Sequence, residues 1–506
     1  MESRCARETT DGIEPRLIGS STAAVAGSDV AGSAAADRKK QETPTRRLAL
    51  WLMVAAQFIV ILDFSIVNVA LPTIERALRF SPVGVEGTIT AYATAFGGVL
   101  ILGGRLADLL GRRRMFIVGL GAFGVTSFGC ALAGSPAFLV IARAAQGLSA
   151  ALLAPAALAL LTTTFAEGPE RNRALGVFGA ATAAGFVCGQ ILGGVLTDVI
   201  GWRSIFLINV PVAGVAAVLA NRAIEPDPAV VARRVPDLAG AALITSAMAL
   251  MVWAPTRGSE RGWGSSAFLI PIVAAAVLLA VFVVVERRQR DPLVRLPMLR
   301  SRWLAGTNAA TAVTGALNGA VVLLCTLFLQ RVHGYSPLRA GLAFVPMGLA
   351  GLLMGIRFAG PLVTRLGVRG VLTMAPLVSA VAIAGLSRLP GAGSYPPLLP
   401  WLTIIGASFT LTAVATTVAV STGVAAHEQG IAAALRQTSF QLGVALGVAV
   451  LLSLAASHTS SLLAGPHAPT PSAARAAGYR LSLTALAVLS ALGGVTAFAT
   501  LRPTPQ

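Results

Sequence analysis

Charged residues are scarce in this chain of 506 residues. They make up 12% of it, whereas hydrophobic residues make up 55% and the mean hydropathy is +0.77. A soluble domain carries about 25% charged residues, so the scarcity excludes a soluble globular protein and indicates one that crosses a membrane many times. The net charge of +18 would suggest a nucleic-acid partner in a soluble protein. Basic loops beside membrane spans explain it better, and we expect no nucleic-acid partner.

Cysteine, histidine and aromatic residues are also few. The four cysteines (Cys5, Cys130, Cys188 and Cys325) lie far apart, which argues against a disulfide framework or a thiolate metal site. The four histidines are equally dispersed, and the sequence has no nucleophile–base pair, metal cluster or phosphate-binding loop. We therefore expect neither an enzyme nor a bound metal or cofactor. Aromatic residues reach only 6%, and spans built mainly from small aliphatic residues suit a wide apolar cavity.

Long apolar segments fill most of the chain. A stretch of about twenty apolar residues crosses the hydrocarbon core as one helix, and fourteen such stretches can be counted. They are 48–71, 82–103, 115–134, 137–163, 174–199, 204–221, 237–256, 267–286, 303–330, 337–358, 370–388, 396–422, 429–456 and 480–501. The fold class that follows is an all-α membrane protein with the lipid bilayer as its surroundings.

The distribution of basic residues predicts the orientation of these spans. With the N-terminal tail inside, the cytoplasmic segments carry 27 Lys and Arg and the outside loops carry 10. The positive-inside rule then places both termini of this multi-pass protein in the cytoplasm, at the cytoplasmic membrane. The tail at 1–47 is polar and lacks apolar periodicity, so we expect it to be disordered. The first apolar run lacks a cleavage site and should remain as a spanning helix.

Two loops repeat each other in the two parts of the chain. Gly104-Arg-Leu-Ala-Asp-Leu-Leu-Gly111 follows the second span, and Gly360-Pro-Leu-Val-Thr-Arg-Leu-Gly367 follows the tenth in the same frame. Matching loops indicate a duplicated bundle, as in many secondary transporters. The predicted domains are a tail at 1–47, a six-helix half at 48–222, a linker with two extra transmembrane helices at 223–302, a second six-helix half at 303–501 and a tail at 502–506.

Asp63 and Arg143 are charged residues that lie well inside predicted spans. Asp63 is about fifteen residues into the first apolar run, roughly 22 Å along a helix, within a hydrocarbon core about 30 Å thick. A lone carboxylate there costs several kcal/mol unless it is protonated, paired or hydrated. Arg143 lies in the fourth span, and its guanidinium must find a carboxylate, carbonyl oxygens or water. Gln146 lies one helical turn further on the same face.

Five motifs in register resemble the fourteen-span drug:proton antiporter branch of the major facilitator superfamily. They are Leu62-Asp63 with Asn68-Val69-Ala70-Leu71-Pro72, the loop Gly104–Arg114, Arg143-Ala-Ala-Gln146-Gly147, the glycines Gly176, Gly185, Gly189, Gly193 and Gly194, and the segment Gly201–Pro211. The resemblance covers nearly everything from 48 to 456. It implies two six-helix halves plus two extra central helices.

The resemblance also implies roles for several residues. Asp63 and Arg143 would form a proton-coupling pair. Gly104, Asp108, Gly111 and Arg112 would form a gating loop, in which Asp108 faces the start of the thirteenth span near Gly430 when the cytoplasmic side is closed. The five glycines of the fifth span would let two helices approach closely, which is what movement between states requires.

Three positions depart from the family pattern. Gln190 replaces the usual proline after the third glycine, which puts the usual kink in doubt and adds a polar group. Glu86-Gly87 replaces a glutamine–tryptophan pair, and Glu86 is either a solvated interfacial acid or a second protonatable site. An arginine usual at the Phe440 position is missing while Arg436 stands one turn earlier, where it either reaches the cytoplasm or takes part in function.

Eight polar residues at membrane depth are candidate cavity or substrate contacts, and each could instead bridge helices. They are Asn68, Glu86, Tyr92, Gln146, Gln190, Asn318, Arg436 and Gln441. The function that we expect is a monomeric, proton-coupled secondary transporter that exports lipophilic or amphipathic small molecules by alternating access. It would need a proton gradient and no cofactor. The alternative is a proton-coupled importer of a small nutrient on the same fold.

Overall fold

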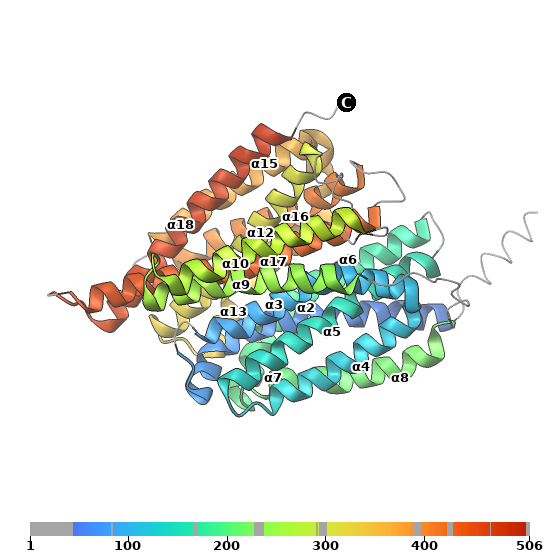
Figure 1. The fold of residues 1–506 in the computed structure, drawn as a ribbon, viewed down its shortest axis with the longest axis horizontal. Helices are drawn as coiled ribbons and strands as arrows, with labels where there is room; N and C mark the ends of the chain where they lie inside the picture. The colour runs from blue at the N-terminus through green and yellow to red at the C-terminus, as the bar shows by residue number, and fades with distance from the viewer. Residues whose placement is uncertain are drawn as a thin grey trace, which may run out of the picture. The chain divides into compact units, whose positions relative to one another are not determined.

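The computed structural model describes residues 44–81, 84–165, 169–226, 237–289, 292, 301–388, 396–422, 429–465 and 467–501. These residues form helices and connecting turns, without a strand among them (Figure 1). The all-α fold predicted from the sequence is therefore confirmed. Most of the predicted N-terminal tail and all of the C-terminal one lie outside the described residues, and the first described helix begins at Pro44.

The first six predicted spans correspond to seven helices. Their bounds are α2 Pro44–Leu78, α3 Gly87–Leu110 after a 3-10 turn at Gly84–Glu86, α4 Arg112–Ala131, α5 Pro136–Thr164, α6 Pro169–Val199, α7 Ser204–Leu207 and α8 Asn209–Ala223. The sixth span is divided into α7 and α8 next to Pro211. Proline is tolerated there because the first turn of a helix has backbone N–H groups without helical partners.

The remaining spans begin with a helical hairpin, α9 Leu238–Arg261 and α10 Ser266–Arg288. The helices that follow are α12 Arg302–Arg331, α13 Pro337–Ala343, α14 Val345–Leu353, α15 Ala359–Ser387, α16 Leu399–Thr422, α17 Gln429–Leu463 and α18 Pro471–Thr500, with a π-helical turn at Met354–Phe358 and a 3-10 turn at Pro396–Leu398. Both α17 and α18 extend beyond the spans predicted from hydropathy. A helix can continue beyond the apolar run that crosses the membrane, so hydropathy alone underestimates its length.

Several helices begin with the same local sequence, a hydroxyl residue followed by proline. Ser135, Ser336 and Thr470 each accept a hydrogen bond from a backbone N–H in the first turn of α5, α13 and α18. The following proline has its φ fixed near the helical value and lacks an N–H that the first turn could not use. These caps fix where the three helices start.

Thirteen helices in the described part of the chain are long and apolar enough to cross a membrane. One of them, Pro337–Ser387, is 51 residues long, which at about 1.5 Å per residue is more than twice the hydrocarbon thickness of about 30 Å. Within it Gly367 has φ 68° and ψ 163°, which is not helical. This segment holds the tenth and eleventh predicted spans.

The chain reverses direction at that glycine. Before it, the backbone of Met347 lies against Gly406, and Gly355 further along the chain lies against Thr410. Both residue numbers increase together, so this segment runs parallel to α16. After it, the last turn of α15 packs against the Trp401 ring at the start of α16, so this segment runs antiparallel to α16. The stretch Pro337–Ser387 is therefore long enough to cross the membrane twice. Counted as two, it brings the thirteen helices of the described residues to fourteen spans.

The two repeated loops share a backbone feature. Gly111 between α3 and α4 has φ 101°, and Gly367, at the matching position of the second loop, has φ 68°. L-residues with a side chain rarely adopt such values, so glycine is needed at both positions. The sequence repeat therefore preserves the residue that lets the chain turn back.

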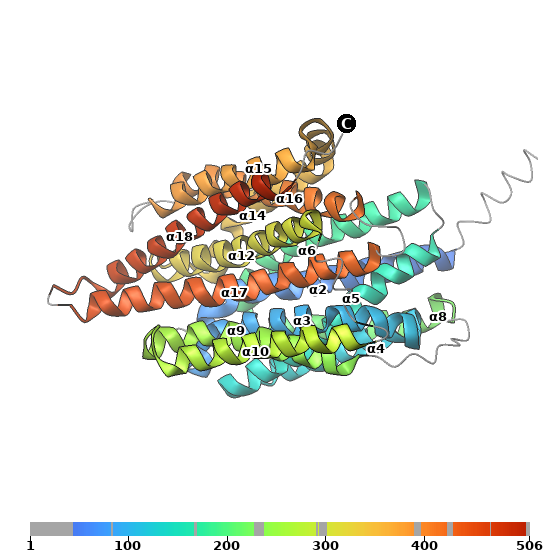
Figure 2. The ribbon, with the colours of Figure 1, turned by 45° about the horizontal axis from the view of Figure 1, so that its top comes forward.

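The helices form two contact groups with the α9–α10 hairpin beside them (Figure 2). In the first group α5 packs against α3 and α4, and α4 packs against α8; in the second, α12 packs against α17 and α18, and α15 packs against α16 and α18. The groups meet where α3 contacts α17 and where α6 contacts α13 and α14. Helix α9 contacts both α3 and α17, so the hairpin lies along one of these two seams.

The α6–α13 seam is very close. A Cβ on Gly341 would lie 2.2 Å from the Gln190 carbonyl oxygen, and one on Gly194 would lie 2.7 Å from Leu338 Cα. Asp198 at the end of α6 accepts a hydrogen bond of 3.0 Å from the Leu338 backbone N–H in the first turn of α13. A carboxylate is favoured at a helix N-terminus, so this contact stabilises the seam.

Candidate functional site: a buried aspartate–arginine cluster

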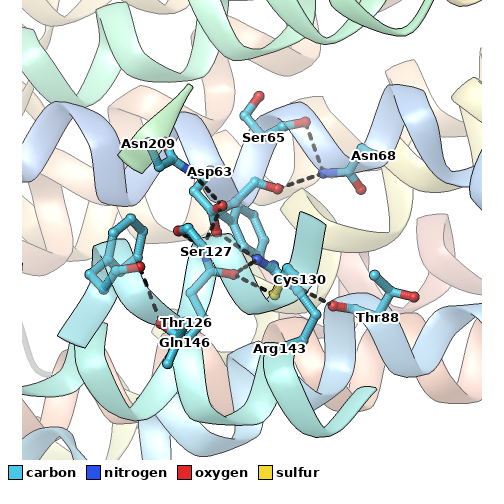
Figure 3. Close-up of polar contacts among 12 residues, drawn as sticks. Asp63, Ser65, Asn68, Thr88, Thr126, Ser127, Cys130, Arg143, Gln146 and Asn209 are labelled. Atoms are coloured by element: carbon cyan, nitrogen blue, oxygen red, sulfur yellow. Dashed lines mark hydrogen bonds and ion pairs between the residues drawn. The ribbon is translucent and has the colours of Figure 1, made fainter. Parts of the chain in front are cut away.

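Helix α2 places Asp63 in a fully buried position. Its side chain is 0% exposed, and both carboxylate oxygens accept hydrogen bonds (Figure 3). Oδ2 accepts from Arg143 Nη1 at 2.6 Å, and Oδ1 accepts from Gln146 Nε2 at 2.9 Å and from Asn209 Nδ2 at 2.8 Å. These three donors come from α5 and α8, so the hydrogen bonds of Asp63 join α2 to both helices.

Arg143 is also fully buried and has several partners. Its Nε donates to the Thr88 backbone oxygen at 2.9 Å, and Nη1 also donates to Gln146 Oε1 at 2.5 Å. The Tyr92 ring lies under the guanidinium, with its centroid 4.4 Å from Cζ. A cation over an aromatic face is stabilised electrostatically, and more so in a site without water. The sequence left open a carboxylate, carbonyl oxygens or water as partners of this arginine, and it contacts both a carboxylate and a carbonyl oxygen.

Gln146 extends the cluster to α4. Its Nε2 donates to Ser127 Oγ at 2.6 Å as well as to Asp63, while the Cys130 thiol lies 3.5 Å from its Oε1. Gln146, Ser127 and Cys130 are all buried. The ion pair is therefore enclosed by polar groups from α2, α3, α4, α5 and α8.

The arrangement fits an ionised Asp63. Each carboxylate oxygen faces N–H donors, and a carboxylate can accept all of these bonds at once. A proton on either oxygen would weaken the charge-assisted bonds that this oxygen accepts and would leave Arg143 as a buried cation with only neutral acceptors. The hydrogen bonds that join α2 to α5 and α8 at this site therefore depend on the charge of Asp63.

The glycines of α6 bring its backbone against α2. A Cβ on Gly185 would lie 2.9 Å from the Phe58 carbonyl oxygen, one on Gly189 would lie 2.9 Å from that of Leu62, and one on Gly193 would lie 2.7 Å from that of Ile66. Gly194, as described above, approaches α13 instead. Gly176 differs, because no atom of the described residues lies within 4 Å of a Cβ placed there. Four of the five glycines therefore lie at close contacts between helices.

Gln190, which stands where the family has proline, is 1% exposed and lies between α6 and α2. Its Nε2 donates to Ser65 Oγ at 3.0 Å, and Ser65 Oγ donates to the Phe186 carbonyl oxygen at 2.8 Å. The Phe186 carbonyl is the acceptor that a proline at 190 would leave without its helical N–H. Ser65 therefore contacts the same turn of α6 that a proline would alter, two residues from Asp63.

The gating loop is placed at one end of the bundle. Asp108 pairs with Arg112 within the loop at 3.0 Å, and its side chain is 62% exposed. Gly104 packs near Pro155 of α5 and Gly111 makes the turn. The expected partner of Asp108 near Gly430 stays a prediction, because residues 423–428 and the side chains at 429–431 lie outside the described ones.

Glu86 is not a solvated acid, and that interpretation is wrong. Its side chain is 2% exposed, and Oε1 accepts a hydrogen bond of 2.6 Å from Thr256 Oγ of α9. Oε2 has no hydrogen-bond partner in the described part of the chain. Glu86 therefore connects α3 to the α9–α10 hairpin rather than to water.

The other candidate contacts fall in different places. Tyr92 is fully buried against Arg143, so it belongs to the ion-pair cluster. Asn68 donates to the Phe64 oxygen of its own helix at 3.1 Å. Gln441 is buried where α17 meets α3. Asn318 and Arg436 are half-buried on α12 and α17.

Sequence reasoning missed two partners in the cluster, the donor Asn209 and the acceptor Ser127. Asn209 follows Trp202-Arg203 by a few residues at the α7–α8 break, and Ser127 lies towards the end of α4. Both had the signal of a polar residue at membrane depth. Nothing in the sequence indicated that their helices lie next to Asp63.

The fold and this site define a class, the polytopic membrane transporters. In the described residues, no group of three or more His, Cys, Asp or Glu could hold a metal ion. A family model described as Major Facilitator Superfamily matches residues 53–448, and the chain belongs to that family. Members of this family are transporters that move small molecules across membranes.

Several relatives are named as exporters or resistance proteins. The chain is 38% identical to "Cephamycin export protein CmcT" of Amycolatopsis lactamdurans, over 83% of this chain and 87% of that protein. It is 37% identical to "Puromycin resistance protein pur8" of Streptomyces alboniger, over 85% and 86%. It is 35% identical to "Tetracenomycin C resistance and export protein" of Streptomyces glaucescens, over 80% and 74%.

A solved structure has the same fold. It is that of a bacterial homolog of the human lysosomal transporter Spinster in an inward-facing and occupied conformation. The TM-score is 0.67, with 16% sequence identity over 92% of this chain and 100% of that one. The likeness extends to the arrangement of the helices.

Proposed function

We propose that the protein exports lipophilic or amphipathic small molecules, including antibiotics, across the cytoplasmic membrane in exchange for protons. The observation that carries the proposal is the enclosed Asp63–Arg143 pair, in a chain 38% identical to a protein named for cephamycin export. We also propose that both termini lie in the cytoplasm, that the protein is a monomer, and that its domains have the boundaries predicted from the sequence.

Asp63 is the proton carrier in this proposal. Ionised, it is held by Arg143, Gln146 and Asn209; protonated, it releases Arg143, and the helices that they join repack. The membrane potential supplies sufficient energy, because one charge that crosses 100 mV yields about 2.3 kcal/mol. At about 1.4 kcal/mol per tenfold ratio, that sustains a substrate gradient of roughly fiftyfold.

The test is proton-driven transport in inverted membrane vesicles that contain the full chain. Cephamycin, puromycin, tetracenomycin C and lincomycin, which appear in the names of relatives, are the first compounds to try. We expect Asp63→Asn to abolish proton-driven accumulation. Glu260→Gln is the matched control, because Glu260 is a partly exposed carboxylate paired with Arg257 near the end of α9.

Full coupled transport by Asp63→Asn would refute the role of Asp63. Proton-driven movement of a polar nutrient in the opposite direction would favour the importer. Raised tolerance of a pump-deficient host, lost on Asp63→Asn, would support export in cells.

A further inference from the structure

A second polar site lies at the other end of α2, away from the ion-pair cluster. It is a pocket of about 440 Å³ between the end of α2, the α12–α13 connection and the start of α18. Ligand pockets in proteins commonly have volumes of about 300–1,000 Å³. We call it the α2–α18 pocket; it is lined by Pro72, Glu75, Arg76, Gln330, Arg331, Gly334, Tyr335, Ser336, Pro337 and Arg475.

The charges around this pocket do not balance. Among the described residues that line it are three arginines (Arg76, Arg331 and Arg475) and one acid, Glu75, so these residues carry a formal net charge of +2. Glu75 is already engaged, because it forms an ion pair with Arg331 that joins α2 to α12. The two cationic groups that remain would be stabilised by an anion from outside the chain.

Arg331 is the best fixed of the three arginines. Its side chain is 16% exposed, and its Nη1 lies 3.3 Å from the Tyr479 hydroxyl of α18. Arg76 and Arg475 are exposed, and in the described part of the chain the hydrogen bond of Arg76 is made by its Nε, which donates to the Pro72 oxygen at 3.2 Å. The terminal nitrogens of an arginine are well placed to bind a carboxylate or phosphate by two parallel bonds.

The rest of the lining suits an amphipathic molecule. Pro72, Pro337 and the Tyr335 ring offer apolar surface, and Gln330 is occupied by its bond of 2.8 Å to the Val69 oxygen. An acid with a small apolar or aromatic body would therefore satisfy both the cationic and the apolar parts of the pocket.

We propose that the α2–α18 pocket binds a small amphipathic anion, whose carboxylate or phosphate lies between Arg76 and Arg475 next to Arg331. The ligand's acid competes with Glu75 for Arg331. Binding therefore weakens the α2–α12 ion pair, and loss of the Glu75 charge strengthens binding. The positive-inside rule places this pocket on the outer face.

The test measures binding rather than transport, so its outcome does not depend on the proposed export. The purified full chain in phosphatidylcholine nanodiscs is titrated with 1-naphthoate and with the uncharged 1-naphthamide, and ligand-observed NMR reports the dissociation constants. We expect naphthoate to bind more tightly than naphthamide. Arg76→Gln and Arg475→Gln should each weaken naphthoate binding about threefold, as loss of one exposed ionic contact predicts.

Two further variants make the result specific. Arg388→Gln is the control, because Arg388 is an exposed arginine at the end of α15 that does not line the pocket. It should leave binding unchanged, and Glu75→Gln should tighten it. Equal binding of naphthoate and naphthamide, or no effect of Arg76→Gln and Arg475→Gln in variants that unfold at the wild-type temperature, would overturn the proposal.

A lipid headgroup carries the same anionic chemistry as a soluble acid. Nanodiscs that also contain phosphatidylglycerol distinguish the two sources. Displacement of naphthoate by this lipid would identify a headgroup as the anion of the site in membranes. Unchanged naphthoate binding would identify a soluble acid.

Discussion

Asn209 Nδ2 lies 2.8 Å from Asp63 Oδ1, although 146 residues separate them in the chain. The bond crosses from α8 to α2 in a region closed to solvent, since Asn209 is 1% exposed and Asp63 is 0% exposed. It shows that the charge of Asp63 is held by more than its ion pair. The first prediction concerns this amide.

Replacement of Asn209 by leucine should destabilise the protein by about 1.5–3 kcal/mol, because a buried charged acceptor loses a donor. Thermal unfolding of the purified protein in detergent measures the effect. Asn68→Leu is the control, since Asn68 is also buried, and in the described residues it bonds to carbonyl oxygens of its own helix. Equal losses in the two variants would show that the contact with Asp63 contributes no more to stability than the contacts of Asn68 do.

The ion pair should behave as one unit. Asp63→Asn and Arg143→Gln should each cost about 3–5 kcal/mol, because each leaves a buried group without its charged partner. The double variant should cost less than the two single changes added together, since it removes both charges. A double-mutant cycle of unfolding temperatures measures the coupling. Additive losses would mean that Asp63 and Arg143 act independently.

The glycines of α6 should differ sharply in their tolerance of a methyl group. In Gly189→Ala the new Cβ would lie 2.7 Å from Ser65 Cβ and 2.9 Å from the Leu62 oxygen, so α6 and α2 must separate. We expect a loss of about 1–3 kcal/mol in stability, together with lower transport. In Gly176→Ala the new Cβ meets no atom of the described residues within 4 Å, and the change should keep or raise stability, because alanine favours helix by about 1 kcal/mol.

Two substitutions at Glu86, one of similar shape and one smaller, test its link to the α9–α10 hairpin. Glu86→Gln keeps the side chain that bonds Thr256 and carries no charge that burial would penalise, so the unfolding temperature should stay the same or rise. Glu86→Ala leaves Thr256 without its partner and opens a cavity, and should cost about 2–5 kcal/mol. A large loss in Glu86→Gln would instead show that a charged Glu86 is required.

Much of this architecture could be predicted from the sequence. Apolar runs of membrane length fix the spans, and a bilayer leaves a buried Asp63 and a buried Arg143 few ways to exist other than together. The resemblance added the register, because it placed the fourth helix beside the first. The reversal at Gly367 was visible as an echo of the loop that contains Gly111.

What could not be predicted depends on how helices pack in three dimensions. Hydropathy does not say that α8 brings Asn209 to Asp63, nor that Glu86 is buried and bonded to Thr256 of α9. The spacing of the α6 glycines likewise does not reveal that Gly176 lies beyond the contact with α2. A polar residue at membrane depth indicates that a partner exists. Which residue is the partner depends on which helix packs next to it.

The partners that the structure gives Asp63 and Arg143 all lie on helices that precede α9. In the described residues, α12–α18 supply none of them. Substitutions in the second contact group can therefore leave these contacts of Asp63 and Arg143 intact. Under the proposed function, such substitutions could change which substrate is transported without changing the residues that couple transport to protons.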